Sequence, residues 1–275
     1  MIDIQNLSFS YGSNAVLQNI SLKLEEGRIY GLLGENGVGK TTLLTLLCGL
    51  KKTGEGTISI DGFDPYKRQP ELLQSIYYLP DEVVAYNQTA RRFARFAGSF
   101  WPDFDMDKFL KIMIEFENDP EKKMSKMSAG QLKKTYIAFA LACNTRYLFM
   151  DEPTNGLDIP SKSQFRKAVG LYTREDSTIV ISTHQVRDLE NIIDPIIILD
   201  RCDVLLNATI EDISEKLFFD YGTTIHQGAL YSEQLPGGFI QVLLNTDRGE
   251  SKVNIEALFN AVHRHKDLIK GMFKN

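Results

Sequence analysis

Gly34-Glu-Asn-Gly-Val-Gly-Lys-Thr41 is the stretch of this 275-residue sequence that decides its fold. It fits the pattern G-x-x-x-x-G-K-[S/T], a glycine-rich loop that holds phosphate groups. Glycine lets the backbone turn tightly, so that its N–H groups face the phosphates, and the N-terminus of the following helix adds partial positive charge. The pattern therefore predicts a nucleotide phosphate site in which Lys40 neutralises phosphate oxygens and Thr41 offers its hydroxyl to Mg²⁺.

The residues around this loop have the order that the motif requires. An apolar run at residues 29–33 predicts a strand before the loop, and residues 40–50 predict a helix after it. Two further apolar runs, at residues 147–150 and 178–182, each enter a polar loop, as buried parallel strands do. The alternation favours an α/β fold with ligands at the carboxyl ends of its strands. A flexible glycine loop, the alternative, would acquire the flanking strand and helix only by accident.

The remaining segments give an outline of the domains. Residues 2–24 alternate apolar and polar positions, which predicts antiparallel strands. We expect a first domain at residues 1–206, with a helical subdomain at about 82–143, and a small accessory subdomain at residues 207–275. In the accessory subdomain we expect a helix at 210–219, a strand pair at 229–244 and a last helix capped by Asn254. We interpret it as a stabilising subdomain or dimer contact rather than as a regulatory ligand site.

The composition is that of an ordinary globular protein, with 43% hydrophobic and 24% charged residues. A net charge of −5 gives no general attraction to a polyanion, so no nucleic-acid partner is expected. The N-terminus lacks the basic and apolar regions of a signal peptide, and the apolar runs are too short to span a bilayer. We therefore expect a cytoplasmic protein that meets a membrane only through a partner. Three widely spaced cysteines predict buried, reduced thiols rather than a disulfide framework or a zinc site.

Two acids, Asp151 and Glu152, follow the apolar run at residues 147–150. An acid at the end of a buried strand can hold Mg²⁺ through its water shell, so Asp151 would position the metal. Glu152 would face the γ-phosphate and orient or deprotonate the attacking water. Two acids alone are better interpreted as a solvated turn after a strand. Together with the phosphate loop, they favour the catalytic interpretation.

Met127-Ser-Ala-Gly-Gln131 precedes a helix that we predict at residues 132–143. Ser128 and Gln131 have the S-x-x-Q spacing of a capping box, so Ser128 would cap a helix whose N-terminus points at an anion. A helix start of this kind also occurs for purely structural reasons and needs no nucleotide.

Five motifs in order resemble the ATP-binding subunits of ABC transporters over about residues 1–206: Tyr11, GENGVGKT, MSAGQ, YLFMDEPTNGLD and Ser182-Thr-His184. The resemblance implies a P-loop ABC-ATPase fold, with a mixed core sheet, an N-terminal antiparallel β subdomain and a helical insertion, here with a small C-terminal α+β appendage. Such proteins act as head-to-tail dimers in which the signature of one subunit closes over ATP held by the phosphate loop of the other.

The resemblance further implies ATP hydrolysis with ATP and Mg²⁺ as cofactors. The implied partners are a second ATP-binding subunit, either the same chain or a related one, and a separate transmembrane permease subunit. The implied location is the cytoplasmic face of the membrane, which the chain would reach through that permease.

The matching residues take their roles from the same resemblance. Tyr11 would stack on adenine, although an ordinary turn tyrosine is the alternative. Asp158 matches the acid that links the two sites across the dimer. His184 resembles the histidine that contacts the γ-phosphate and positions Glu152, so these two would be the catalytic residues. The phosphate loop would hold ATP through Asn36, Gly37, Gly39, Lys40, Thr41 and Thr42, and the signature would contact the partner's γ-phosphate through Ser128, Gly130 and Gln131.

The sequence departs from the family pattern in two places. The signature has Met127 and Ala129 where leucine and glycine are usual, which are mild changes. The position where glutamine is usual in the Q-loop holds Asp81 instead. Asp81 could reach Mg²⁺ through water, and Glu82 is an alternative for the role.

The residues 100–105, the MSAGQ signature and the appendage look most like those of bacterial ABC-2-type exporters of drugs, lipids or peptides. The alternative is a soluble ABC protein of DNA repair, chromosome structure or translation. Such proteins typically show tandem ATPase domains, a long coiled-coil insertion, zinc cysteines or basic arms, and this sequence has none of them.

An aromatic stripe at Phe93, Phe96, Phe100 and Trp101 follows Thr89, a predicted helix cap. It could form part of a docking surface for the permease. We interpret it as core, because a stripe on a helix usually faces inward.

Overall fold

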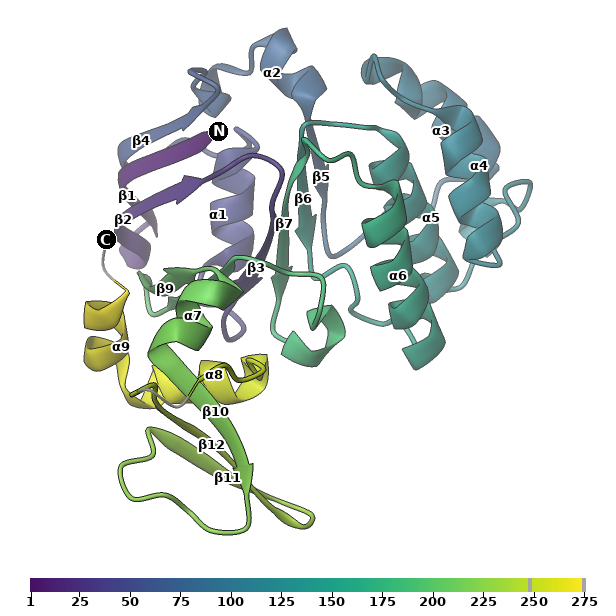
Figure 1. The fold of residues 1–275 in the computed structure, drawn as a ribbon. Helices are drawn as coiled ribbons and strands as arrows, with labels where there is room; N and C mark the ends of the chain where they lie inside the picture. The colour runs from purple at the N-terminus through teal and green to yellow at the C-terminus, as the bar shows by residue number, and fades with distance from the viewer. Residues whose placement is uncertain (247–248, 274–275) are drawn as a thin grey trace.

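A six-stranded sheet forms the centre of the molecule (Figure 1). The computed structural model describes residues 1–246 and 249–273. The strands, in spatial order, are β5 (Ile76–Leu79), β6 (Tyr147–Asp151), β7 (Thr178–Thr183), β3 (Ile29–Leu33), β8 (Ile196–Asp200) and β9 (Asp203–Ala208). The first five are parallel and β9 is antiparallel to β8. Every residue of β6, β7 and β8 is buried, which explains their continuous apolar runs.

A second, antiparallel sheet contains β1 (Ile2–Tyr11), β2 (Asn14–Leu24) and β4 (Glu55–Ile60), in the order β2-β1-β4. Helix α1 (Lys40–Leu47) lies between this sheet and the central one (Figure 1). Buried side chains of both sheets and of α1 form one hydrophobic cluster. The helix stops before residue 50, because Gly49 has a positive φ of 65° and a Cβ there would come within 2.0 Å of the Pro65 carbonyl oxygen.

The helical insertion predicted from the resemblance is confirmed. It contains α3 (Ala90–Ala97), α4 (Met106–Glu115) and α5 (Ala129–Ala142), with short 3₁₀ helices η2 (Gly98–Phe100) and η3 (Met124–Lys126). Helix α6 (Ile159–Tyr172) packs beside α5 (Figure 1). Phe139 of α5 stands at the centre of this region, in ring contact with Phe93, Trp101 and Phe104.

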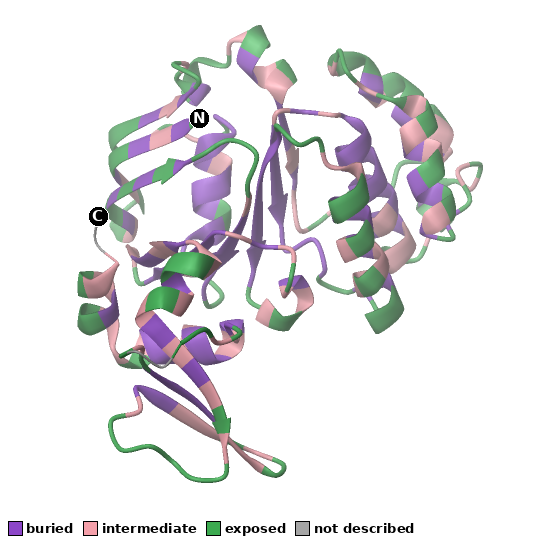
Figure 2. Cartoon of the chain, viewed as in Figure 1, coloured by how far each residue is buried: buried purple, intermediate pink, exposed green. Residues whose placement is uncertain are grey.

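The interpretation of the aromatic stripe as core is wrong for two of its residues. Phe93 is buried, but Phe96 is 69% exposed and Phe100 is 62% exposed. Ala90, Phe93 and Ala94 form the inward face of α3, and this leaves Phe96 on the outer face. Phe100 lies beyond the end of α3, in η2, where the helical period changes. The green and pink residues over α3 in Figure 2 show this open side.

The C-terminal part consists of a third sheet and three helices. The sheet has the order β10-β12-β11, with β10 (Leu217–Gly222), β11 (Tyr231–Leu235) and β12 (Gly238–Leu244). The helices are α7 (Ile210–Lys216), α8 (Ile255–Arg264) and α9 (Lys266–Met272). The helix predicted at 210–219 is too long by three residues, because Leu217 and Phe219 alternate inward and pair with β12. The predicted strand pair and the Asn254 cap of α8 are confirmed.

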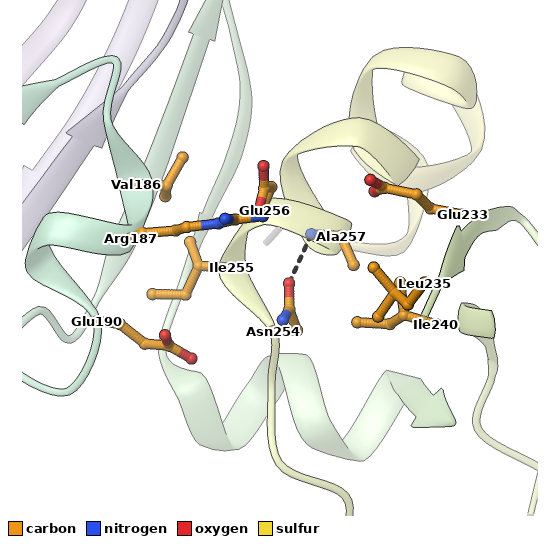
Figure 3. Close-up of a pocket in the computed structure, with 10 residues that line it drawn as sticks. All are labelled: Val186, Arg187, Glu190, Glu233, Leu235, Ile240, Asn254, Ile255, Glu256 and Ala257. Atoms are coloured by element: carbon orange, nitrogen blue, oxygen red, sulfur yellow. Dashed lines mark hydrogen bonds and ion pairs between the residues drawn. The ribbon is translucent and has the colours of Figure 1, made fainter. Parts of the chain in front are cut away.

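The C-terminal part packs against the segment that follows β7. That segment forms the 3₁₀ helix η4 (Val186–Leu189), and a cavity of about 180 Å³ lies between it and α8. Figure 3 shows the residues that line this cavity. Arg187 Nε donates a hydrogen bond of 2.5 Å to Glu256 Oε2 at the edge of this cavity. Two lysines of α9, Lys266 and Lys270, pair with Asp200 and Asp203 at the turn between β8 and β9. The appendage is thus fastened at two places.

Two short helices, η1 (Pro65–Lys67) and α2 (Pro70–Ser75), connect β4 to β5. In the described part of the chain, no helix is both long enough and apolar enough to cross a membrane.

Candidate functional site

A cavity of about 390 Å³ lies beside the phosphate loop, at the carboxyl end of β3 and β6. Ten of the residues predicted for the site line it: Tyr11, Asn36, Gly37, Gly39, Lys40, Thr41, Thr42, Asp81, Asp151 and Glu152. They come from separate parts of the sequence, and the parallel sheet brings them to one edge.

The glycines of the loop have the backbone that the motif requires. Gly37 has φ 82° and Gly39 has φ 112°, both in the left-handed region that favours glycine. Gly39 also precedes the first turn of α1 directly, so the backbone N–H groups of this turn face the cavity side of the loop. Lys40 is buried, and its Nζ donates hydrogen bonds to the carbonyl oxygens of Gly34 at 2.8 Å and Glu35 at 3.1 Å.

Asp151 is held by three hydroxyl groups. Thr41 Oγ1 donates to its Oδ2 at 2.6 Å, Tyr78 Oη lies 3.4 Å from the same oxygen, and Ser182 Oγ donates to Oδ1. Burial and the nearby Asp151 carboxylate raise the pKa of the Tyr78 phenol, which therefore stays protonated and can donate. Asp151 itself is only 2% exposed.

The carboxylate of Glu152 lies between the ammonium group of Lys40 and the imidazole ring of His184. Its Oε1 is 3.4 Å from Lys40 Nζ and 2.9 Å from His184 Nδ1. The backbone N–H of His184 also donates to Oε2 at 3.3 Å. Glu152 has a positive φ of 44°, an uncommon conformation for a residue with a side chain, and its N–H is held by Ser182. Ser182 at the end of β7 therefore fixes the backbone of Glu152, and His184, just after the strand, fixes its side chain.

Tyr11 lies at the open side of the cavity and is half exposed. Its Oη is 3.4 Å from Thr42 Oγ1, and this hydrogen bond, together with the nearby Lys51, lowers the pKa of the phenol despite partial burial. Lys51 Nζ lies 4.9 Å from the ring centroid. The ring is accessible for stacking.

The signature residues do not line the cavity in the single chain. Ser128, Gly130 and Gln131 begin helix α5, and the capping box predicted for Ser128 and Gln131 is present. Asp158 caps α6, since its Oδ1 accepts a hydrogen bond of 2.9 Å from Ser161 N. His184 contacts Glu152 without lining the cavity.

Asp81 lines the cavity, but its carboxylate faces other residues than the phosphate loop. Lys133 Nζ lies 3.3 Å from Oδ1, and Asn155 Nδ2 lies 3.4 Å from each carboxylate oxygen. Glu82 is exposed and does not line the cavity.

Sequence reasoning did not find five residues of this neighbourhood: Asn14, Val16, Tyr78, Ser182 in its contact with Asp151, and Lys133. Tyr78 and Ser182 lie within strands, and their facing neighbours depend on the order of strands in the sheet. The apolar and aromatic run Ile76–Leu79 directly before Pro80 is the one sequence signal that could have placed Tyr78 near a strand end.

The residues present fit a magnesium ion. A threonine hydroxyl and a carboxylate, 2.6 Å apart, are oxygen donors of the kind that Mg²⁺ accepts. Among the described residues, no group of three or more His, Cys, Asp or Glu side chains is arranged to hold a metal. A metal here would therefore take few protein ligands and complete its shell with phosphate oxygens and water, as Mg²⁺ does at nucleotides.

The comparisons with known proteins all point to the same family. A family model described as ABC transporter matches residues 17–155. The chain is 28% identical over 262 residues to the ABC transporter ATP-binding protein YtrB of Bacillus subtilis (strain 168), covering 92% of this chain and 89% of that protein. It is 30% identical to the bacitracin transport ATP-binding protein BcrA of Bacillus licheniformis, covering 78% and 72%. A solved dimeric, post-hydrolysis ATP-binding cassette bound to ADP and Pi has a similar fold, with a TM-score of 0.67, 22% identity and coverage of 76% and 98%.

Proposed function

The chain belongs to the ABC transporter family, and from this premise we propose that it is the ATP-hydrolysing motor subunit of a membrane exporter. It is an ATP-binding subunit of an ABC transporter and an ATPase. The observation that carries the proposal is the contact of Glu152 with both Lys40 and His184 beside the phosphate loop. The bacitracin transport for which the Bacillus licheniformis relative is named supports a transport role, and we propose export as its direction.

In this function, Lys40 would exchange its contact with Glu152 for the β- and γ-phosphate oxygens of ATP. Glu152, freed from that cation but still held by His184, would accept a proton from the attacking water. The water oxygen bonds to the γ-phosphorus as the bond to the bridging oxygen breaks, which gives ADP and phosphate. His184 would keep the carboxylate in place through the 2.9 Å contact of Nδ1 and present its other ring nitrogen to the γ-phosphate.

Magnesium would be held by Thr41 and Asp151, and when bound it neutralises the charge of the phosphate oxygens. The hydroxyls of Ser182 and Tyr78 orient the Asp151 carboxylate toward Thr41. They add no charge, so the carboxylate keeps its attraction for a cation.

We propose a head-to-tail dimer as the working form. Ser128 and Gly130 are away from the cavity of their own chain, and Ser128 is exposed at the start of α5. An exposed helix N-terminus favours contact with an anion such as the γ-phosphate of a partner's ATP. Asp158 and the exposed Ile159 beside it would lie at the same interface.

Substitution of Glu152 by Gln tests the proposed base. The amide keeps the size of the side chain but cannot accept the proton, so hydrolysis should fall by at least about a hundredfold. ATP binding should persist, and the dimer should be trapped in size-exclusion chromatography with Mg·ATP. Glu215→Gln, at an exposed position of α7, is the control. Undiminished turnover of Glu152→Gln would exclude this residue as the base.

We further propose a docking site for the transmembrane subunit in an apolar groove of about 500 Å³. Its walls are formed by the end of α1, by α2, by β5 and by η2, and they include Leu50, Leu73, Tyr78, Phe100 and Trp101. Tyr78 connects the groove to the nucleotide cavity, because it lines the groove and its Oη lies 3.4 Å from Asp151. An exposed apolar groove beside two exposed phenylalanines favours contact with a protein partner.

Phe100→Glu tests the docking site, since a charge in the groove opposes burial by a partner. The variant should lose recovery with the membrane fraction of its native cells, while the purified subunit keeps its ATPase rate. Ile114→Glu, at an exposed position of α4 outside the groove, should stay with the membranes. Recovery of the unmodified chain with ribosomes or DNA instead of membranes would contradict the transport role.

A further inference from the structure

We propose that Asp81 and Lys133 form a charge pair that positions the signature turn of α5 against the end of β5. Asp81 and Lys133 are positioning residues in this proposal, and neither contacts the reacting atoms. The inference rests on the proposed function for one point, namely that Ser128 and Gly130 in the signature turn contact the partner's ATP.

Lys133 is a buried cation that faces the chain directly after β5. It lies in the second turn of α5 and is only 4% exposed. Its Nζ donates a hydrogen bond of 2.5 Å to the carbonyl oxygen of Asp81, and it lies 3.3 Å from Asp81 Oδ1 and 3.5 Å from the carbonyl oxygen of Pro80. One ammonium group therefore ties a helix of the insertion to a strand of the central sheet.

The burial of this ammonium makes a counter-ion necessary. Desolvation lowers the pKa of Lys133, and the charge of Asp81 opposes that shift. Asp81 is suited to the task, because its side chain is 41% exposed and so keeps part of its hydration. A glutamine at this position could accept the hydrogen bond but could not neutralise the charge.

Asp81 also reaches a third segment. Asn155 Nδ2, in the loop that follows Glu152, lies 3.4 Å from both carboxylate oxygens. The end of β5, the signature helix and the loop after β6 thus meet at one carboxylate. A change in the distance between the helical insertion and the central sheet would therefore alter the contacts of all three segments with this carboxylate.

The alternative role for Asp81 is contact with Mg²⁺, since it lines the cavity that also contains Thr41 and Asp151. The two roles predict different behaviour of Lys133. A metal contact does not require Lys133, whereas a charge pair requires both residues.

The test uses the Glu152→Gln protein as the parent and adds Asp81→Asn, Lys133→Met or both. For each protein, two constants are measured: the affinity of the monomer for ATP, and the dissociation constant of the Mg·ATP-driven dimer. Each single substitution should weaken the dimer about tenfold, and Lys133→Met, at a residue outside the nucleotide cavity, should leave the monomer's ATP affinity unchanged, because the signature contacts only the partner's ATP. The double variant should recover most of the loss. A loss in which the two single effects add would overturn the pair.

The dependence of hydrolysis on the Mg²⁺ concentration distinguishes the charge pair from a contact of Asp81 with the metal. If Asp81→Asn raises the Mg²⁺ concentration needed for half-maximal hydrolysis in the otherwise unmodified protein, and Lys133→Met does not affect the dimer, Asp81 serves the metal and the proposal is wrong.

One further variant and one further measurement apply where these proteins do not fold or do not dimerise. Should Lys133→Met fail to fold, Asp81→Glu replaces it: this variant keeps the charge and should keep the dimer, and an equal loss in Asp81→Glu and Asp81→Asn would overturn the pair. If the parent does not dimerise with Mg·ATP, the proposed function fails. The pair is then judged by urea unfolding, in which the double variant must have a higher midpoint than either single variant.

Discussion

Lys40 is the single residue on which nucleotide affinity should depend most. Its ammonium is buried and satisfied by two carbonyl oxygens of the loop, with Glu152 at 3.4 Å. These contacts hold the ammonium group beside the loop. Phosphate oxygens can therefore join an ammonium that is already in place, with little loss of side-chain entropy.

Lys40→Ala should weaken ATP binding by a factor of between about ten and about a hundred, because hydrogen bonds to charged groups contribute about 1.5–3 kcal/mol. Isothermal titration calorimetry measures the change. Lys52→Ala, an exposed lysine after α1, is the matched control and should bind ATP as the unmodified protein does. Equal affinities for the two variants would remove Lys40 from the site.

At the scale of single residues, the sequence predicted most of the residues that line the nucleotide cavity, because each of the phosphate-loop and carboxylate motifs is a short stretch that can be recognised by itself. It did not predict Lys133. Its partner Asp81 is 52 residues away, and their contact depends on how α5 lies over the end of β5. For the same reason the hydroxyl groups of Tyr78 and Ser182 around Asp151 were not foreseen.

Among the elements, helix α5 begins with a residue, Ser128, that caps the helix and that we also propose to contact the partner's ATP. Ser128 Oγ accepts the hydrogen bond from Gln131 N at 3.2 Å, and Gln131 Oε1 accepts one from Ser128 N at the same distance. The box was predictable from four residues, because its two hydrogen bonds are local. The length of α7 was not, because its end is set by the pairing of β10 with β12, about 25 residues further along.

Ser128→Ala should lower the free energy of unfolding by about 1 kcal/mol, the usual contribution of an N-cap. Thr89→Ala removes a comparable cap from α3 and should cost about as much. Only Ser128→Ala should also reduce ATP hydrolysis, since Thr89 is not part of the signature. Urea unfolding and a phosphate-release assay distinguish the two effects. A loss of hydrolysis shared by both variants would assign Ser128 a structural role alone.

In the molecule as a whole, the C-terminal part shares its core with the nucleotide domain. Ile213, Leu217 and Leu258 are fully buried and belong to the same hydrophobic cluster as Ile198 of β8 and Leu206 of β9. We therefore propose that residues 207–275, of which 247–248 and 274–275 lie outside the described residues, form a subdomain that does not fold by itself. The order of strands and this shared core depend on long-range packing, which the sequence pattern does not contain.

A chain that ends at residue 206 should expose this shared cluster. We expect it to aggregate, or to unfold at a lower temperature and over a broader range than the full chain, as seen by circular dichroism and light scattering. Arg187→Ala in the full chain is the comparison, because it removes only an exposed ion pair with Glu256, and exposed ion pairs contribute little to stability. An unchanged melting temperature of the shortened chain would show two independent domains.

The position of β3 has a consequence for how the protein is made. The strand that carries the phosphate loop is synthesised well before its neighbours in the sheet, β7 and β8, which begin at residues 178 and 196. Until those strands leave the ribosome, the loop has no sheet behind it, and such distant pairings form slowly. The nascent chain should therefore be unable to bind nucleotide until β7 and β8 have emerged, and its unpaired apolar strands should need chaperones until then.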